Sequence, residues 1–113
     1  MNFRQFFETI LNPEVIDFAN RHRIQITPDN KFILYHGTRN PTAKLIRTEG
    51  FFRKGTFFTE DYNYALTAQD GPMGTQSSRK GKMVVMKVKV DPALLWLGVR
   101  IEAKTEIPVE EID

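Results

Sequence analysis

The chain has 113 residues, enough for one domain with a single core. It contains no cysteine, which excludes disulfides and thiolate metal sites, and its net charge of +2 is too small to indicate a partner by itself. Arg4 and Glu8 interrupt the first apolar run and no stretch has the length of a membrane span, so we expect a cytoplasmic protein without a signal peptide or a membrane contact.

Residues 1–30 are expected to form two helices that pack on a sheet. Apolar residues at i, i+3 and i+4 spacing predict the first helix: Phe3, Phe6, Phe7, Ile10 and Leu11. Asn12-Pro13 provides a cap and a first turn for the second, with Val15, Ile16 and Ala19 on its inner side. The polar stretch 27–30 predicts a turn.

The middle of the chain alternates short strands and helices. The apolar run Phe32–Tyr35 predicts a buried strand that ends at His36. Asn40-Pro41 begins a helix that ends at Gly50, with Ala43, Leu45 and Ile46 buried. Thr56–Thr59 predicts another strand, and a helix begins near Asp61 and carries Tyr62, Tyr64, Ala65 and Ala68.

The last third of the chain is predicted to be mostly strand. Gln69–Gly81 has no periodicity and is expected to be a long loop. Residues 83–90 give the strongest strand signal, residues 93–98 an apolar connection, and Val99–Ile107 one alternating strand whose inner side is Val99, Ile101, Ala103, Thr105 and Ile107. Helices and short strands without regular βαβ alternation predict an α+β fold.

Three groups of residues are candidates for a functional site, and each also has a plain structural explanation. His36-Gly37 offers an imidazole that can donate to a ribose hydroxyl or act as a base, beside a glycine that a flat ligand can approach, or it is only a strand end with a turn. The aromatic residues near position 60 are a stacking wall or part of the core: Phe57, Phe58, Tyr62 and Tyr64. Glu102 and Glu106, about 13 Å apart on one strand, are too distant for a carboxylate pair and are otherwise an exposed charged face.

A basic cluster lies around the predicted loop: Arg79, Lys80, Lys82, Lys87 and Lys89. It attracts phosphate or nucleic acid, or it is a solvated face, since no aromatic residue is interleaved with it.

The order of the motifs carries more information than any of them alone. "LYHGT", "AxxIxxxGF", "GTFFTEDxxxA", a Val-rich strand and a Glu-bearing strand ending in "IPxExI" together resemble the ADP-ribosyltransferase superfamily. The resemblance spans roughly residues 32–112 and is to the small members with a His-Tyr-Glu site, related to diphtheria toxin and the poly(ADP-ribose) polymerases. It implies a single domain with a split antiparallel sheet, in which residues 1–30 are a helical extension and residues 31–113 are the NAD-binding core.

The resemblance also implies roles for individual residues. His36 contacts the ribose on the adenosine side of NAD, Gly37 holds the nicotinamide carboxamide through its backbone, and Phe57 stacks on the ring. Glu102 is the matching catalytic carboxylate, and Glu106 is the other candidate. Ala68 stands where relatives carry a second aromatic residue, so either Tyr62 or Tyr64 substitutes for it or the ring is stacked from one side only. The remaining residues assigned to NAD binding are Tyr35, Thr38 and Thr59, and those assigned to acceptor recognition are Arg79 and Lys80; no metal is implied.

The activity implied is mono-ADP-ribosyl transfer from NAD to a protein, nucleic-acid or small-molecule acceptor. Arg100 stands two residues before Glu102, so the arginine-modifying type with paired glutamates fits poorly. One alternative is an RNA 2′-phosphotransferase, a relative on the same fold that needs more His and Arg than this chain, with two His, supplies. The other is a non-catalytic module that binds nucleic acid or an acidic protein.

Overall fold

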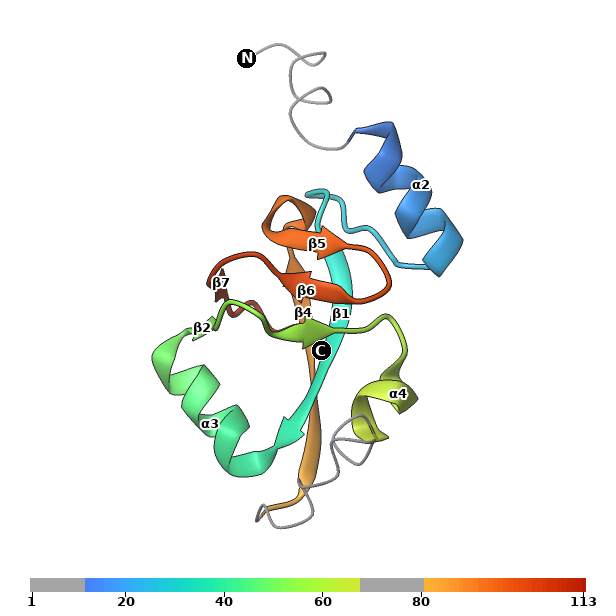
Figure 1. The fold of residues 1–113 in the computed structure, drawn as a ribbon. Coiled ribbons are helices and arrows are strands. Elements are labelled where there is room, and N and C mark those ends of the chain that lie inside the picture. The colour runs from blue at the N-terminus through green and yellow to red at the C-terminus, as the bar shows by residue number, and fades with distance from the viewer. Residues whose placement is uncertain (1–11, 68–80) are drawn as a thin grey trace.

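A computed structural model describes residues 12–67 and 81–113 and shows an α+β domain (Figure 1). The helices are α2 (Pro13–His22), α3 (Asn40–Glu49), α4 (Tyr62–Thr67) and a 3₁₀ turn, Pro92–Leu94. The strands are β1 (Phe32–Arg39), β2 (Phe51–Phe52), β3 (Phe57–Phe58), β4 (Met83–Val90), β5 (Leu95–Leu97), β6 (Ile101–Ala103) and β7 (Ile107–Pro108). The helix expected over residues 3–11, Ala68 and the loop residues 69–80 lie outside the described residues.

β1 and β4 form the long antiparallel pair at the centre of the molecule (Figure 1). Their register runs from Phe32 opposite Val90 to Arg39 opposite Met83. The prediction that the first strand ends at His36 is therefore wrong: the strand continues to Arg39, because β4 provides hydrogen-bonding partners along this whole length. Fully buried side chains line one face of the pair: Phe32, Leu34, Met86, Val88 and Val90.

The smaller strands extend this pair into a broken antiparallel arrangement. Tyr35 and Thr59 exchange two backbone hydrogen bonds of 2.7 and 2.9 Å, which places β3 beside β1. β3 then pairs with β6, and β6 with β5, while β2 pairs separately with β7. Within the described residues Tyr35–Thr59 is the one bridge between β1 and β3, so these two strands separate on either side of it.

α2 begins and packs largely as its sequence predicts. The Asn12 side chain accepts a hydrogen bond of 2.9 Å from the Val15 amide, which caps the first turn. Phe18 and Ala19 are buried in the same core as β1, so this part of the N-terminal extension packs on the core. Ile16 is 41% exposed, contrary to expectation, because the inward stripe follows Val15, Phe18 and Ala19.

α3 confirms its predicted ends but not all of its buried residues. Gly50 adopts φ 86° and donates its amide to the Ile46 carbonyl at 2.8 Å, which ends the helix. Ala43 is fully buried and Ile46 packs against the core. Leu45 is 51% exposed, because it lies about 200° around the helix from Ala43.

The predicted single strand Val99–Ile107 is wrong. Bends at residues 104–105 divide it into β6, which pairs with β3 and β5, and β7, which pairs with β2. Ile101, Ala103 and Ile107 are buried as expected, but Val99 is fully exposed next to the β5–β6 turn and Thr105 is exposed in the bend. The expected apolar connection at residues 93–98 is also wrong, since it contains β5.

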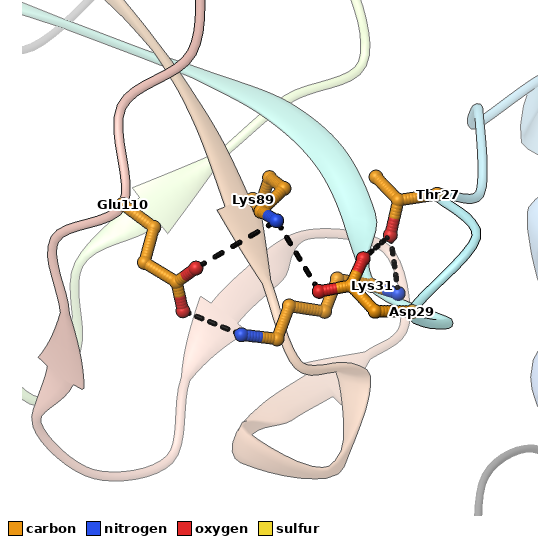
Figure 2. Close-up of polar contacts among 5 residues, drawn as sticks. All are labelled: Thr27, Asp29, Lys31, Lys89 and Glu110. Atoms are coloured by element: carbon orange, nitrogen blue, oxygen red, sulfur yellow. Dashed lines mark hydrogen bonds and ion pairs between the residues drawn. The ribbon is translucent and has the colours of Figure 1, made fainter.

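The segment that follows β7 is fixed against β4. Lys89 donates its amide to the Glu110 carbonyl and Ile112 donates to the Lys87 carbonyl, both at 2.9 Å. The Glu110 carboxylate lies between the ammonium groups of Lys31 and Lys89, and Lys89 also meets Asp29 at 3.2 Å (Figure 2). Thr27 hydrogen-bonds to Asp29, so the predicted turn at residues 27–30 belongs to the same cluster.

Candidate functional site

The candidate site lies where β1 and β3 separate. Backbone groups of alternate β1 residues point to opposite sides: Asn40, just after the strand, bonds to Lys82 on the β4 side, whereas Tyr35 bonds to Thr59 on the β3 side. Gly37 has the parity of Tyr35, so its N–H and C=O face the β3 side. The carbonyl of Phe57, which has the parity of Thr59, faces β1.

The imidazole of His36 bridges this separation. Its Nδ1 lies 2.8 Å from the Phe57 carbonyl oxygen, and since a carbonyl only accepts, Nδ1 carries the proton and donates it. The ring also contacts the buried rings of Phe52 and Phe58, at 5.4 and 5.8 Å between centroids. His36 thus connects the "LYHGT" strand to the "TFFT" strand, which the sequence separates by a helix and β2.

Burial sets the charge state of His36. It lowers the pKa of the imidazole below its ordinary 6.5, and the hydrogen bond to the Phe57 carbonyl opposes this only in part. At neutral pH the ring is therefore neutral, with Nε2 free of a proton. It is suited to accept a hydrogen bond from a hydroxyl through Nε2, rather than to donate one as the sequence led us to expect.

Gly37 is required for the packing of α4. A Cβ built on it would lie 1.6 Å from the carbonyl oxygen of Ala65. We expected the missing Cβ of Gly37 to leave space for a flat ligand. The backbone of α4 occupies that space. The Gly37 N–H and C=O are directed toward β3, and the residue itself is buried. Thr38, also assigned to NAD binding, is 3% exposed.

Phe57 and Glu102 face each other across β3 and β6. Because cross-strand partners project to the same side of a sheet, their side chains share one face. Phe57 is 46% exposed and carries the guanidinium of Arg100 at 5.1 Å from its ring centroid, whereas Phe58, on the opposite face, is buried. The His36 ring lies with Phe58, so His36 and Glu102 are connected through Phe57 from opposite faces of β3.

The two tyrosines of α4 differ in their surroundings. The ring of Tyr62 meets Tyr35 edge-on at 5.8 Å, beside the Tyr35–Thr59 bridge. Tyr64 is 63% exposed and contacts no aromatic ring of a described residue. Like Phe57, both tyrosines are exposed, so of the four aromatic residues near position 60 only Phe58 belongs to the core.

Glu106 is connected to His36 through β7 and β2. It is exposed and precedes Ile107, which pairs with Phe52, and the Phe52 ring touches His36. No ion pair joins Glu102 or Glu106 to any residue that the structure describes. The expected separation of about 13 Å between Glu102 and Glu106 assumed one continuous strand. It does not apply, because the chain bends between the two residues.

Trp96 and Lys104 belong to this surface and were not predicted. Trp96 lies opposite Glu102 on β5, is 58% exposed, and has the Lys104 ammonium 4.7 Å from its ring centroid. The alternation of Arg100, Glu102 and Lys104 indicated a shared face. Nothing local indicated β5, so Trp96 was placed in a connection. Arg79 and Lys80 lie outside the described residues.

Searches for other kinds of site are negative within the described ranges. No cluster of His, Asp or Glu in residues 12–67 and 81–113 has a metal-binding arrangement. None of the described helices combines the length and the apolar character that crossing a membrane requires. Comparison with protein-family models, with curated proteins and with solved structures gives no match to this chain.

Proposed function

We propose that this protein is a mono-ADP-ribosyltransferase that uses NAD as donor and has a split-sheet fold formed by β1–β4 and β3–β6–β5. The observation that carries the proposal is the chain of contacts from His36 through Phe57 to Glu102. Three motifs far apart in the sequence thereby lie on neighbouring strands, with Phe57 in the middle.

The chemistry of each group fits a role in binding NAD. The neutral Nε2 of His36 accepts a hydrogen bond from a ribose hydroxyl. The Gly37 N–H and C=O offer a donor and an acceptor side by side, which matches a carboxamide. Phe57 and Tyr62 supply exposed rings near the Tyr35–Thr59 bridge, where a planar ring can stack. The positions of Tyr35 and Thr59 then serve to hold β3 against β1.

Glu102 is the carboxylate that we assign to catalysis. When the bond between nicotinamide and ribose breaks, the bonding electrons leave with nicotinamide and positive charge develops on the sugar. A half-buried carboxylate held on a strand stabilises that charge without reorganising, and it can accept a hydrogen bond from the 2′-hydroxyl. Glu106 is exposed between the bend and β7, outside any strand, which makes it the less preorganised of the two.

The assignment is tested by following nicotinamide release from NAD. We expect Glu102→Gln to lower the rate at least about 100-fold, as removal of a preorganised electrostatic group does, and Glu106→Gln to have a much smaller effect. Glu49→Gln, at the exposed end of α3, is the matched control and should retain activity. Circular dichroism verifies that each variant is folded. Equal rates for the wild type and Glu102→Gln would refute the role of Glu102.

Arg100 favours the RNA 2′-phosphotransferase as the second candidate. Its guanidinium lies over Phe57, beside the proposed sugar site, where it can bind an additional phosphate. Loss of phosphate from a 2′-phosphorylated oligoribonucleotide in the presence of NAD, abolished by Arg100→Gln, would support this reading over simple transfer. If neither reaction occurs with any acceptor, the non-catalytic module is the remaining explanation.

A further inference from the structure

Exposed aromatic rings and basic side chains lie together on one face of the three-stranded sheet. We call this the aromatic–basic face: Phe57, Trp96, Arg100, Glu102 and Lys104. Trp96 and Phe57 are both cross-strand partners of Glu102, one on each side of it. Their backbones are therefore about 10 Å apart, twice the spacing of neighbouring strands. The two rings therefore lie at separate places on this face.

Each ring of this face is accompanied by a cation. Arg100 lies 5.1 Å from the centre of Phe57 and Lys104 lies 4.7 Å from the centre of Trp96. Neither cation forms an ion pair with a residue in the described part of the chain. With two cations and one carboxylate, the face has a net positive charge.

We propose that the aromatic–basic face binds single-stranded nucleic acid, with a base stacked on Trp96 and the backbone phosphates held by Lys104 and Arg100. Any base can stack on an indole, and a phosphate accompanies each base, so an exposed ring with cations beside it suits a single strand. A duplex hides the faces of its bases inside the helix and leaves Trp96 without a partner. The basic cluster around residues 79–89 has no interleaved aromatic residue. The aromatic–basic face consists of other residues, and it combines cations with aromatic rings.

Binding at this face is separate from the proposed transferase activity, although the two are adjacent. A base stacked on Trp96 lies next to Glu102, across β6 from Phe57, and the phosphate held by Arg100 lies toward the Phe57 ring. If the proposed function is correct, the bound nucleic acid is placed as the acceptor. This one consequence rests on the proposed function, whereas the binding itself does not.

Trp96 reports on its own binding because it is the only tryptophan in the chain. The intact protein is titrated with a short oligothymidylate in the absence of NAD while tryptophan fluorescence is recorded. We expect quenching that saturates, and an affinity that falls as NaCl is raised from about 50 to 200 mM. Absence of quenching at low salt would overturn the proposal.

Variants separate stacking from charge, with anisotropy of a fluorescein-labelled oligothymidylate as the readout. Trp96→Ala should weaken binding about 5- to 150-fold, the usual range for loss of one stacked base. Lys104→Gln should reduce the slope of log affinity against log salt by about 1. Lys44→Gln, an exposed lysine on α3, is the matched control and should bind like the wild type. Unchanged affinity in Trp96→Ala would contradict the assignment.

Two further measurements exclude other partners and separate the test of binding from the test of transferase activity. Tighter binding to a duplex of the same sequence, or quenching by anionic vesicles but not by the oligonucleotide, would overturn the proposal. Glu102→Gln removes a carboxylate from the face, so it should bind the strand at least as tightly as the wild type. Lost turnover with retained binding in this variant would support both proposals, and retained turnover with retained binding would contradict only the catalytic one.

Discussion

His36 shows how a single side chain can depend on partners that are remote in the sequence. Its identity and its place after an apolar run made it a candidate from the sequence alone. Its tautomer was not predictable, because that follows from the Phe57 carbonyl, which reaches it only in the folded chain. Its lowered pKa likewise follows from burial beside Phe52 and Phe58.

The lowered pKa of His36 predicts a loss of stability in acid. The unfolded chain takes up the proton near pH 6.5, whereas the folded chain takes it up only at lower pH. Between these values the unfolded state binds more protons, so the free energy of unfolding decreases as the pH falls below about 6.5. The decrease is measured by urea denaturation at a series of pH values from about 7.5 to about 5, a range that spans the ordinary pKa of histidine.

His36→Gln should make that decrease smaller, since its amide can donate to the Phe57 carbonyl but does not titrate. His22→Gln replaces the other histidine, which stacks on Phe18, and should keep the decrease of the wild type. The same acid sensitivity in His36→Gln would show that other groups cause it.

At the scale of elements, local signals were read correctly and pairing was not. The cap at Asn12 and the left-handed Gly50 were predictable, because a helix end is fixed by residues within one turn. The extension of β1 to Arg39, the strand β5 and the division of residues 99–107 were missed. Each of these depends on a strand that lies elsewhere in the sequence.

The contact between α4 and β1 predicts that Gly37→Ala is strongly destabilising. The added methyl group meets the backbone carbonyl of Ala65, which cannot rotate away as a side chain can. We expect a loss of about 1–3 kcal/mol or more in the free energy of unfolding, measured with urea. Gly98→Ala is the matched control, because its Cβ would enter open space, and it should change stability by less than about 0.5 kcal/mol. Similar losses in both variants would refute close packing at Gly37.

For the molecule as a whole, the charged cluster in Figure 2 joins three distant parts of the chain. Asp29 and Lys31 precede β1, Lys89 lies on β4, and Glu110 lies in the last segment. The Glu110 carboxylate, as a hydrogen-bond acceptor, is the main cause of a raised pKa at Lys31. Glu110 thus helps to fix the last segment beside β4.

Glu110→Gln should lower the free energy of unfolding by up to about 1 kcal/mol at low salt, because the group is partly exposed. The difference from the wild type should shrink at about 1 M NaCl, where the screening length is roughly 3 Å. Urea denaturation at both salt concentrations measures it. Glu106→Gln, which removes the same charge from an exposed residue just before β7, should leave stability unchanged. A loss that is independent of salt in Glu110→Gln would argue against an electrostatic role.

The sequence by itself determined the α+β class, the helix ends and the identity of the candidate residues. These depend on composition, on periodicity and on interactions within a few residues. Only the tertiary structure decided that His36, Phe57 and Glu102 lie on successive strands, that Gly37 receives α4, and that Trp96 stands beside Glu102. The physical reason is that strand pairing joins backbone groups that no local pattern specifies, so the residues it brings together are known only once the chain has folded.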